Sequence, residues 1–319
     1  MSRRALLMLL PLAVAGAVAV PAPGTSAAPL PTRYVLPGQD VFPEGVTAAD
    51  GTFYVTSTTD GTIFRGRLSR ARTQVFLPGG RDGRTTAVGL EVTPDGSRLV
   101  VAGGSTGRVF VYDTRDGALI ARFSNGGDAS STFLNDVAFD PAGNAYITDS
   151  VSPVLYRIPA AQIASGTGRS RPLRPFVQFT GTAFSYVEGF NANGIDVTAD
   201  GRFALVVQSQ TGRLFRVGLK DRSVRRVQLG SATLKNGDGL EVDGRTVYVV
   251  RNVNGLIVQL RLSADARSAV RVSTTTSPSL RYPTTVALAR GRLLVVNSQF
   301  DKRGGDPQEP FTVSSLPRP

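Results

Sequence analysis

The chain has 319 residues and a formal net charge of +12, and it contains neither cysteine nor histidine. The first absence excludes disulfides. The second excludes serine–histidine hydrolases, histidine-dependent zinc hydrolases, and copper, iron or manganese redox sites held by histidine. Most basic residues are arginines scattered along the chain, apart from the clusters at 169–171 and 221–226. We therefore expect a solvated basic surface with no nucleic-acid partner, and loose association with the anionic cell envelope stays open.

The N-terminus has the three parts of a secretory signal. Arg3 and Arg4 precede an apolar run from Leu6 to Val20, and small residues follow up to Ala28. The run is shorter than the roughly 20 residues that a membrane-spanning helix needs. We predict a signal peptide over residues 1–28, a secreted, extracellular protein, and a single domain over 29–319 with no transmembrane segment after cleavage. The export route, general or twin-arginine, stays open.

One sequence pattern recurs six times after the signal. Each unit has a polar residue, an apolar strand, a tight turn with glycine, and two further strands that alternate apolar and polar residues. A less regular fourth strand fits between units, as in Gln74–Leu77. The units begin at Glu44, Val88, Asn135, Asn193, Asp238 and Thr284.

Four strands in about 45 residues is the repeat of a β-propeller blade. The sequence therefore predicts an all-β fold, a six-bladed β-propeller, in place of a β-sandwich, which needs no units of near-constant length. The last unit ends one strand short, and residues 33–36 form a strand without a blade. We expect this N-terminal strand to complete the last blade and close the ring.

The residues that open the units form a candidate metal site. The first strand of every propeller blade lines the central channel, so equivalent positions meet at one rim. Four of the six are oxygen donors: Glu44, Asn135, Asn193 and Asp238. Hard divalent cations prefer such carboxylate and amide oxygens. Asn or Asp beside Gly is also an ordinary turn pair, but turns do not explain the shared register or the glutamate.

These residues, on six repeats from about 43 to 300, resemble the senescence marker protein/gluconolactonase/luciferin-regenerating-enzyme family. The resemblance implies that Glu44, Asn193 and Asp238 bind a divalent metal and that Asn135 contacts the metal, its water or the substrate. The implied ion is Ca²⁺, or another divalent cation such as Mg²⁺, Mn²⁺ or Zn²⁺. It further implies hydrolysis of a small-molecule lactone or activated ester, with Asp238 and Asn135 as catalytic residues.

Two departures from the family narrow this expectation. Sugar lactonases place an arginine two residues before the Asn-Asp pair, where this chain has Phe133, and the related paraoxonases use a histidine. We expect an apolar pocket and a monomer. The aromatic residues expected to line the pocket are Phe133, Phe184, Tyr186 and Phe190. A non-catalytic propeller stabilised by calcium, which binds a ligand or protein, and an envelope-associated structural protein remain as alternatives.

Overall fold

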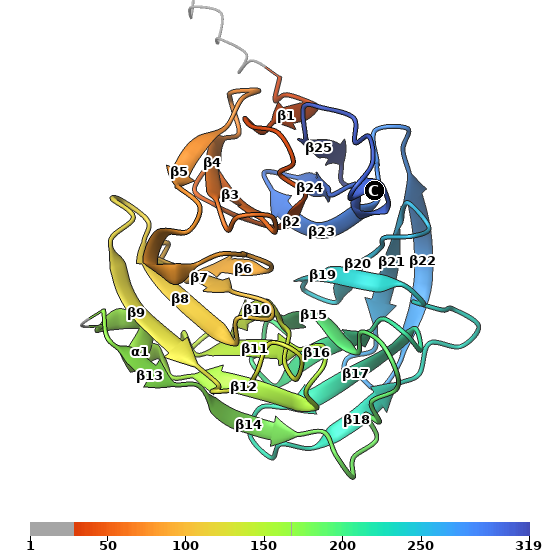
Figure 1. Cartoon of the computed structure of the whole chain (residues 1–319). Coiled ribbons are helices and arrows are strands. Elements are labelled where there is room, and N and C mark those ends of the chain that lie inside the picture. The colour runs from red at the N-terminus through yellow and green to blue at the C-terminus, as the bar shows by residue number, and fades with distance from the viewer. Residues whose placement is uncertain (1–28, 167) are drawn as a thin grey trace, which may run out of the picture.

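The fold is a closed ring of six β-sheets around a central axis (Figure 1). The computed structural model describes residues 29–166 and 168–319. The predicted six-bladed β-propeller is confirmed. The signal-peptide prediction lies outside the described residues and stays a prediction.

The first three blades follow the chain order, each from an inner to an outer strand. Blade two has a fifth strand that the sequence did not predict, which pairs in parallel with its outer strand. Their strands are β2 (Pro43–Ala49), β3 (Thr52–Ser57), β4 (Ile63–Arg67) and β5 (Gln74–Leu77); β6 (Leu90–Val92), β7 (Arg98–Ala102), β8 (Arg108–Asp113), β9 (Leu119–Ser124) and β13 (Ser170–Pro172); and β10 (Leu134–Phe139), β11 (Ala145–Asp149), β12 (Val154–Ile158) and β14 (Arg174–Gln178).

The last three blades repeat this antiparallel order. Helical segments are short: α1 (Ala160–Ala164) and the 3₁₀ turns η1 (Arg81–Gly83) and η2 (Phe300–Lys302). No helix in the described part of the chain is long and apolar enough to span a bilayer. The strands are β15 (Ala192–Val197), β16 (Phe203–Gln208), β17 (Arg213–Gly218) and β18 (Val224–Val227); β19 (Gly237–Asp243), β20 (Thr246–Arg251), β21 (Leu256–Leu262) and β22 (Ala269–Thr276); and β23 (Pro283–Ala289), β24 (Arg292–Asn297), β25 (Thr312–Pro317) and β1 (Arg33–Val35).

The N-terminal strand closes the ring as the sequence predicted. β1 pairs antiparallel with β25, with Tyr34 opposite Val313, and so becomes the outer strand of blade six. Its other edge reaches blade one, where Val35 forms a parallel bridge with Arg72. Tyr34 is fully buried in the cluster between blades six and one. The first and last strands of the described residues are thus joined in one sheet, and an exposed sheet edge is avoided.

The hydrophobic core is divided into six clusters, one at each boundary between neighbouring blades. Alternation along each strand places apolar side chains on both blade faces, because each blade is covered on both sides by a neighbour. This packing brings the six inner strands together around the channel (Figure 1).

Candidate metal centre

A β-bulge marks the candidate ligand in each of the blades that supply one. The pairing of inner and second strands shifts between Pro43 and Val46 in blade one, and the same shift occurs at the equivalent step of blades three, four and five, and also of blade six, where Thr284 opens the unit. A bulge leaves an extra residue outside the regular ladder and redirects its side chain. The four oxygen donors are therefore parts of bulged strands, and the alternative of turns before strands is wrong.

Three of the ligands are followed by a glycine because the next blade leaves no room for a side chain at that position. A side chain at Gly45 would place its Cβ 2.6 Å from the carbonyl oxygen of Val88, and one at Gly194 would lie 2.2 Å from that of Asp238. In the same way, a Cβ at Gly239 would lie 2.7 Å from the Cα of Thr285. Each glycine thus lets the inner strand of the next blade approach closely. The pairs Glu44-Gly45, Asn193-Gly194 and Asp238-Gly239 combine a ligand with this close approach.

The structure brings the four predicted ligands to one cavity of about 320 Å³ on the axis. All four side chains are buried and none is more than 6% exposed. The second and sixth opening positions, Val88 and Thr284, supply no ligand. Val88 is part of the cavity wall, and the hydroxyl of Thr284 donates to the backbone carbonyl of Glu44 at 2.7 Å.

Two serines fix the direction in which the amide oxygens point. The hydroxyl of Ser150 donates its single hydrogen to the carbonyl of Ala192 at 2.7 Å, so it can only accept from Asn135, whose Nδ2 lies 2.9 Å away. Ser209 does the same for Asn193, with Nδ2 also 2.9 Å away, while it donates to the carbonyl of Gly237. The Oδ1 atom of each asparagine must then face away from its serine.

Three buried oxygens at this site have no hydrogen-bond partner in the described part of the chain: Glu44 Oε2, Asn135 Oδ1 and Asn193 Oδ1. A buried polar atom without a partner costs roughly 1–3 kcal/mol. Oxygen atoms that the fold holds in this way, without donors, are what a hard cation coordinates. The observed residues therefore fit a divalent cation bound by Glu44, Asn135, Asn193 and Asp238.

The surroundings of Glu44 and Asp238 destabilise the ionised forms of both carboxyl groups. Burial, followed by repulsion from Asp238 and Asp136, raises the pKa of Glu44 well above its usual range. Burial raises the pKa of Asp238 to about 7, although hydrogen bonds from Asn252 and Asn193 oppose the shift. A cation between them would reverse both effects. Across the described residues no group of three or more Asp, Glu, His or Cys side chains is arranged to hold a metal, so a cation bound here would also need the amide oxygens.

A second layer of carboxylates lies deeper in the channel, around a cavity of about 230 Å³. Burial raises the pKa of Glu91 to about 8 and those of Asp136 and Asp196 to about 7, and that of Glu241 rises well above its usual range. Three of them connect blades: Glu91 accepts from Thr47, Asp136 from the amide of Ile195 and Asp196 from that of Val242. The sequence analysis missed this layer. It could have been found from the repeats, because Glu91, Asp196 and Glu241 each stand three residues after the opening position of their unit.

The aromatic residues predicted for the pocket divide into two pairs. Phe133 and Phe190 line the cavity, and their rings meet edge to face with centroids 5.0 Å apart. Phe184 and Tyr186 do not, and this part of the prediction is wrong. Phe184 is fully buried against Phe215, with centroids 4.3 Å apart, and the hydroxyl of Tyr186 donates to the carbonyl of Asp149. The long loop before Asn193 folds back on the blade because its aromatic side chains are more stable in the core.

Sequence reasoning missed several other residues of the site. Asn252 donates from Nδ2 to Oδ2 of Asp238 at 2.9 Å, and it sits in a turn whose polar residues the repeats place at this rim. Ser150 and Ser209 directly follow the second strands of blades three and four. They too could have been found from their equivalent positions in the repeats. Val253, Tyr282 and Phe300 add apolar wall from blades five and six. Nothing in their local sequence distinguishes them from other loop residues.

Comparison with known proteins supports the fold. Three of the solved structures that are similar over most of this chain illustrate this. They are the allergen Mala s 1 of Malassezia sympodialis (14% identity, TM-score 0.68, 90% of this chain and 96% of that one), regucalcin of Agrobacterium tumefaciens, described as a calcium-binding protein (20%, 0.61, 91% and 96%), and virginiamycin B lyase of Staphylococcus aureus (11%, 0.55, 89% and 98%). No protein-family model and no curated protein sequence matches. At these identities the likeness establishes the fold alone.

Removal of either serine hydroxyl should weaken calcium binding. In Ser150→Ala or Ser209→Ala the asparagine amide loses the acceptor that fixes its rotamer, and we expect a loss of about tenfold to a hundredfold in affinity, as for other groups that orient metal ligands. Isothermal titration calorimetry with CaCl₂ measures it. Ser131→Ala, which removes an exposed hydroxyl from the loop before Asn135, is the matched control. Equal affinity in all three variants would contradict the assigned orientation.

Calcium affinity should also depend on pH. The folded pKa of Asp238 is raised to about 7, so below that pH a bound proton competes with the cation, and above it the carboxylate is free. We expect affinity to rise with pH from 5.5, by up to tenfold per pH unit for each proton released, and to level off only where Asp238 and Glu44 are both ionised. Titrations in buffers of different ionisation enthalpy count the released protons. A constant affinity without proton release would contradict this assignment.

Proposed function

We propose that the protein is a secreted, divalent-metal-dependent hydrolase of a lactone or another activated ester with an apolar group. The observation that supports this most strongly is the set of three buried, unpartnered oxygens beside Asp238 in an open cavity. A cavity of about 320 Å³ is at the lower end of the usual size for small-molecule sites. It leaves room for a substrate directly above the ligand oxygens.

A bound divalent cation would supply Lewis acidity, which polarises the ester carbonyl and stabilises negative charge on its oxygen. Asp238 is the candidate base for a water molecule. Asn252 donates to Oδ2 and so holds the orientation of the carboxylate that would accept the proton. The water oxygen then bonds to the acyl carbon, the acyl–oxygen bond breaks, and the proton held by Asp238 passes to the leaving alkoxide. The products are the carboxylic acid and the alcohol.

The walls of the cavity favour an apolar substrate. Val88, Phe133 and Phe190 line one part of the cavity, and Val253 and Phe300 line another. Phe190 and Val253 are 44% and 61% exposed, which leaves apolar surface at the mouth for a ligand to cover. With Phe133 in place of a sugar-binding arginine, a polyhydroxy acid would lack a charged partner at that position. We therefore propose a lactone or aryl ester with a hydrocarbon side chain.

The second candidate is a non-catalytic propeller in which calcium stabilises the channel and the mouth binds a ligand. The four oxygen-donor side chains of the cavity would support this second candidate equally well. A measurement of turnover must therefore distinguish the hydrolase from the binding propeller. A lyase reaction is less well supported. A histidine-to-alanine variant of the similar virginiamycin B lyase is described as catalytically inactive, and this chain has no histidine.

The hydrolase proposal predicts turnover that depends on both calcium and Asp238. The mature chain should hydrolyse phenyl acetate or δ-undecalactone in CaCl₂, and EDTA should abolish the activity. Asp238→Asn keeps the shape but removes the base and one charge, so kcat/KM should fall by at least a hundredfold. Asp301→Asn, which removes an exposed carboxylate next to Phe300, is the matched control and should keep its activity.

The possible negative results of the turnover assay lead to different conclusions about the site. Calcium binding without turnover on apolar lactones and aryl esters would favour the binding propeller. Turnover that is insensitive to EDTA, or equal in the wild type and Asp238→Asn, would reject the proposed site. Calcium titration of the same samples separates loss of the metal from loss of the base.

A further inference from the structure

A large cleft lies between blades one and two, away from the channel. Its volume is about 810 Å³, more than twice that of the axial cavity. Strands β3 and β4 and the turn before β5 form one wall, and Thr114, directly after β8, contributes from blade two. The inner part of the same boundary is filled by an apolar cluster that includes Tyr54, Ile63 and Tyr112. The cleft is the outer part of this boundary, where the packing ends.

Four arginines line the cleft: Arg65, Arg67, Arg70 and Arg72. Arg65 and Arg67 are two apart on β4, so both point to the same face of the blade, about 7 Å apart along the strand. Arg70 and Arg72 lie in the turn that leads to β5. Arg67, Arg70 and Arg72 are exposed. On the opposite face of blade one, the Phe53 ring packs over Gly66. A side chain at Gly66 would collide with this ring.

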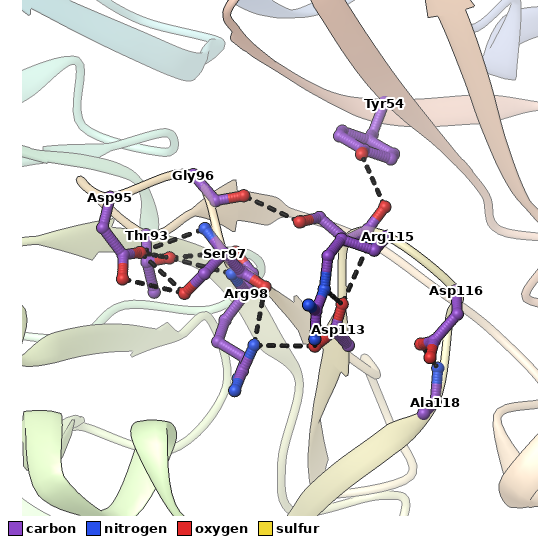
Figure 2. Close-up of polar contacts among 11 residues, drawn as sticks. Tyr54, Thr93, Asp95, Gly96, Ser97, Arg98, Asp113, Arg115, Asp116 and Ala118 are labelled. Atoms are coloured by element: carbon purple, nitrogen blue, oxygen red, sulfur yellow. Dashed lines mark hydrogen bonds and ion pairs between the residues drawn. The ribbon is translucent and has the colours of Figure 1, made fainter.

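No carboxylate neutralises these four guanidinium groups. None of them takes part in an ion pair among the described residues, and the residues not described contain no Asp or Glu. The nearby Asp113 is already occupied: Arg98 and Arg115 both bind it, and hydrogen bonds from Arg115 lower its pKa to about 2 (Figure 2). Four like charges therefore line one cleft without counter-charge from the protein.

Two contacts hold the inner end of the cleft in place. The Arg65 guanidinium stacks over the Phe76 ring at 4.5 Å from its centroid and donates to the carbonyl of Thr114 at 3.4 Å. The hydroxyl of Tyr54 donates to the same carbonyl (Figure 2). Arg65 thus covers the aromatic ring of Phe76, and Tyr54 is only 4% exposed. The cleft offers no open aromatic surface for the stacking of nucleic-acid bases.

We propose that this cleft binds an acidic oligosaccharide. Guanidinium groups spaced about 7 Å apart match charged groups repeated along a chain better than one small ion, and each can bind a carboxylate or sulfate through two hydrogen bonds. Thr52 and Gln74 line the same wall and supply neutral partners for sugar hydroxyls. The inference does not depend on the metal centre. It gives the loose association with the anionic cell envelope, which the sequence left open, a specific location.

Binding of short acidic glycans to the mature chain tests this inference. The probes are fluorescent tetragalacturonate, which carries carboxylates, and a heparin-derived tetrasaccharide, which carries sulfates, with maltotetraose as the uncharged comparison. We expect at least one acidic probe to bind in 50 mM NaCl, to weaken with salt because the charges are screened, and to be unaffected by EDTA. Maltotetraose should not bind. The preferred acidic probe identifies the anionic group.

The decisive comparison uses two triple variants of equal net charge. Arg67→Gln/Arg70→Gln/Arg72→Gln removes exposed charges from the cleft and should weaken binding at least tenfold. Arg213→Gln/Arg225→Gln/Arg226→Gln removes as many exposed charges from blade four and should change affinity less than twofold. Melting temperatures confirm that both variants fold. Equal loss in the two variants, no binding of either acidic probe, or tighter binding of an eight-residue oligothymidylate would overturn the proposal.

Discussion

The convergence of six inner strands on one axis is the constraint on which the rest of the structure depends. The blades can approach one another this closely only where Cβ atoms are absent at the crowded positions, and the glycines after Glu44, Asn193 and Asp238 meet that requirement. The bulge at the same step leaves the preceding residue free of the regular ladder. Packing and ligand placement are therefore two consequences of one local geometry.

The electrostatics of the channel follow from this arrangement. Burial removes the site carboxylates from water, and the unpaired amide oxygens beside them add to the cost. The deeper acids offset part of their own cost by accepting hydrogen bonds from neighbouring blades, as Asp136 and Asp196 do. Three oxygens of the upper layer, Glu44 Oε2 and the Oδ1 atoms of Asn135 and Asn193, have no such donors among the described residues. This difference between the two layers is the physical reason to assign a cation to the upper one.

Much of the fold and the central part of the site could be predicted from the sequence, because both depend on a repeat. Six units fix the number of blades, and a shared register brings Glu44 and Asp238 together although 194 positions separate them. The walls are different, since they come from loops of irregular length. Nothing local shows that Phe184 enters the core while Phe190 faces the cavity. The arginines of the cleft were visible in sequence, but only the structure shows that the boundary between two blades opens there.

The most direct test of the metal centre is a crystal structure of the mature chain grown with CaCl₂, with anomalous differences measured at a long wavelength. The account predicts one strong peak on the axis, 2.3–2.6 Å from Glu44 Oε2, the Oδ1 atoms of Asn135 and Asn193 and a carboxylate oxygen of Asp238, as expected for calcium–oxygen contacts. Density for water alone at that position, at a calcium concentration that saturates binding in solution, would contradict it.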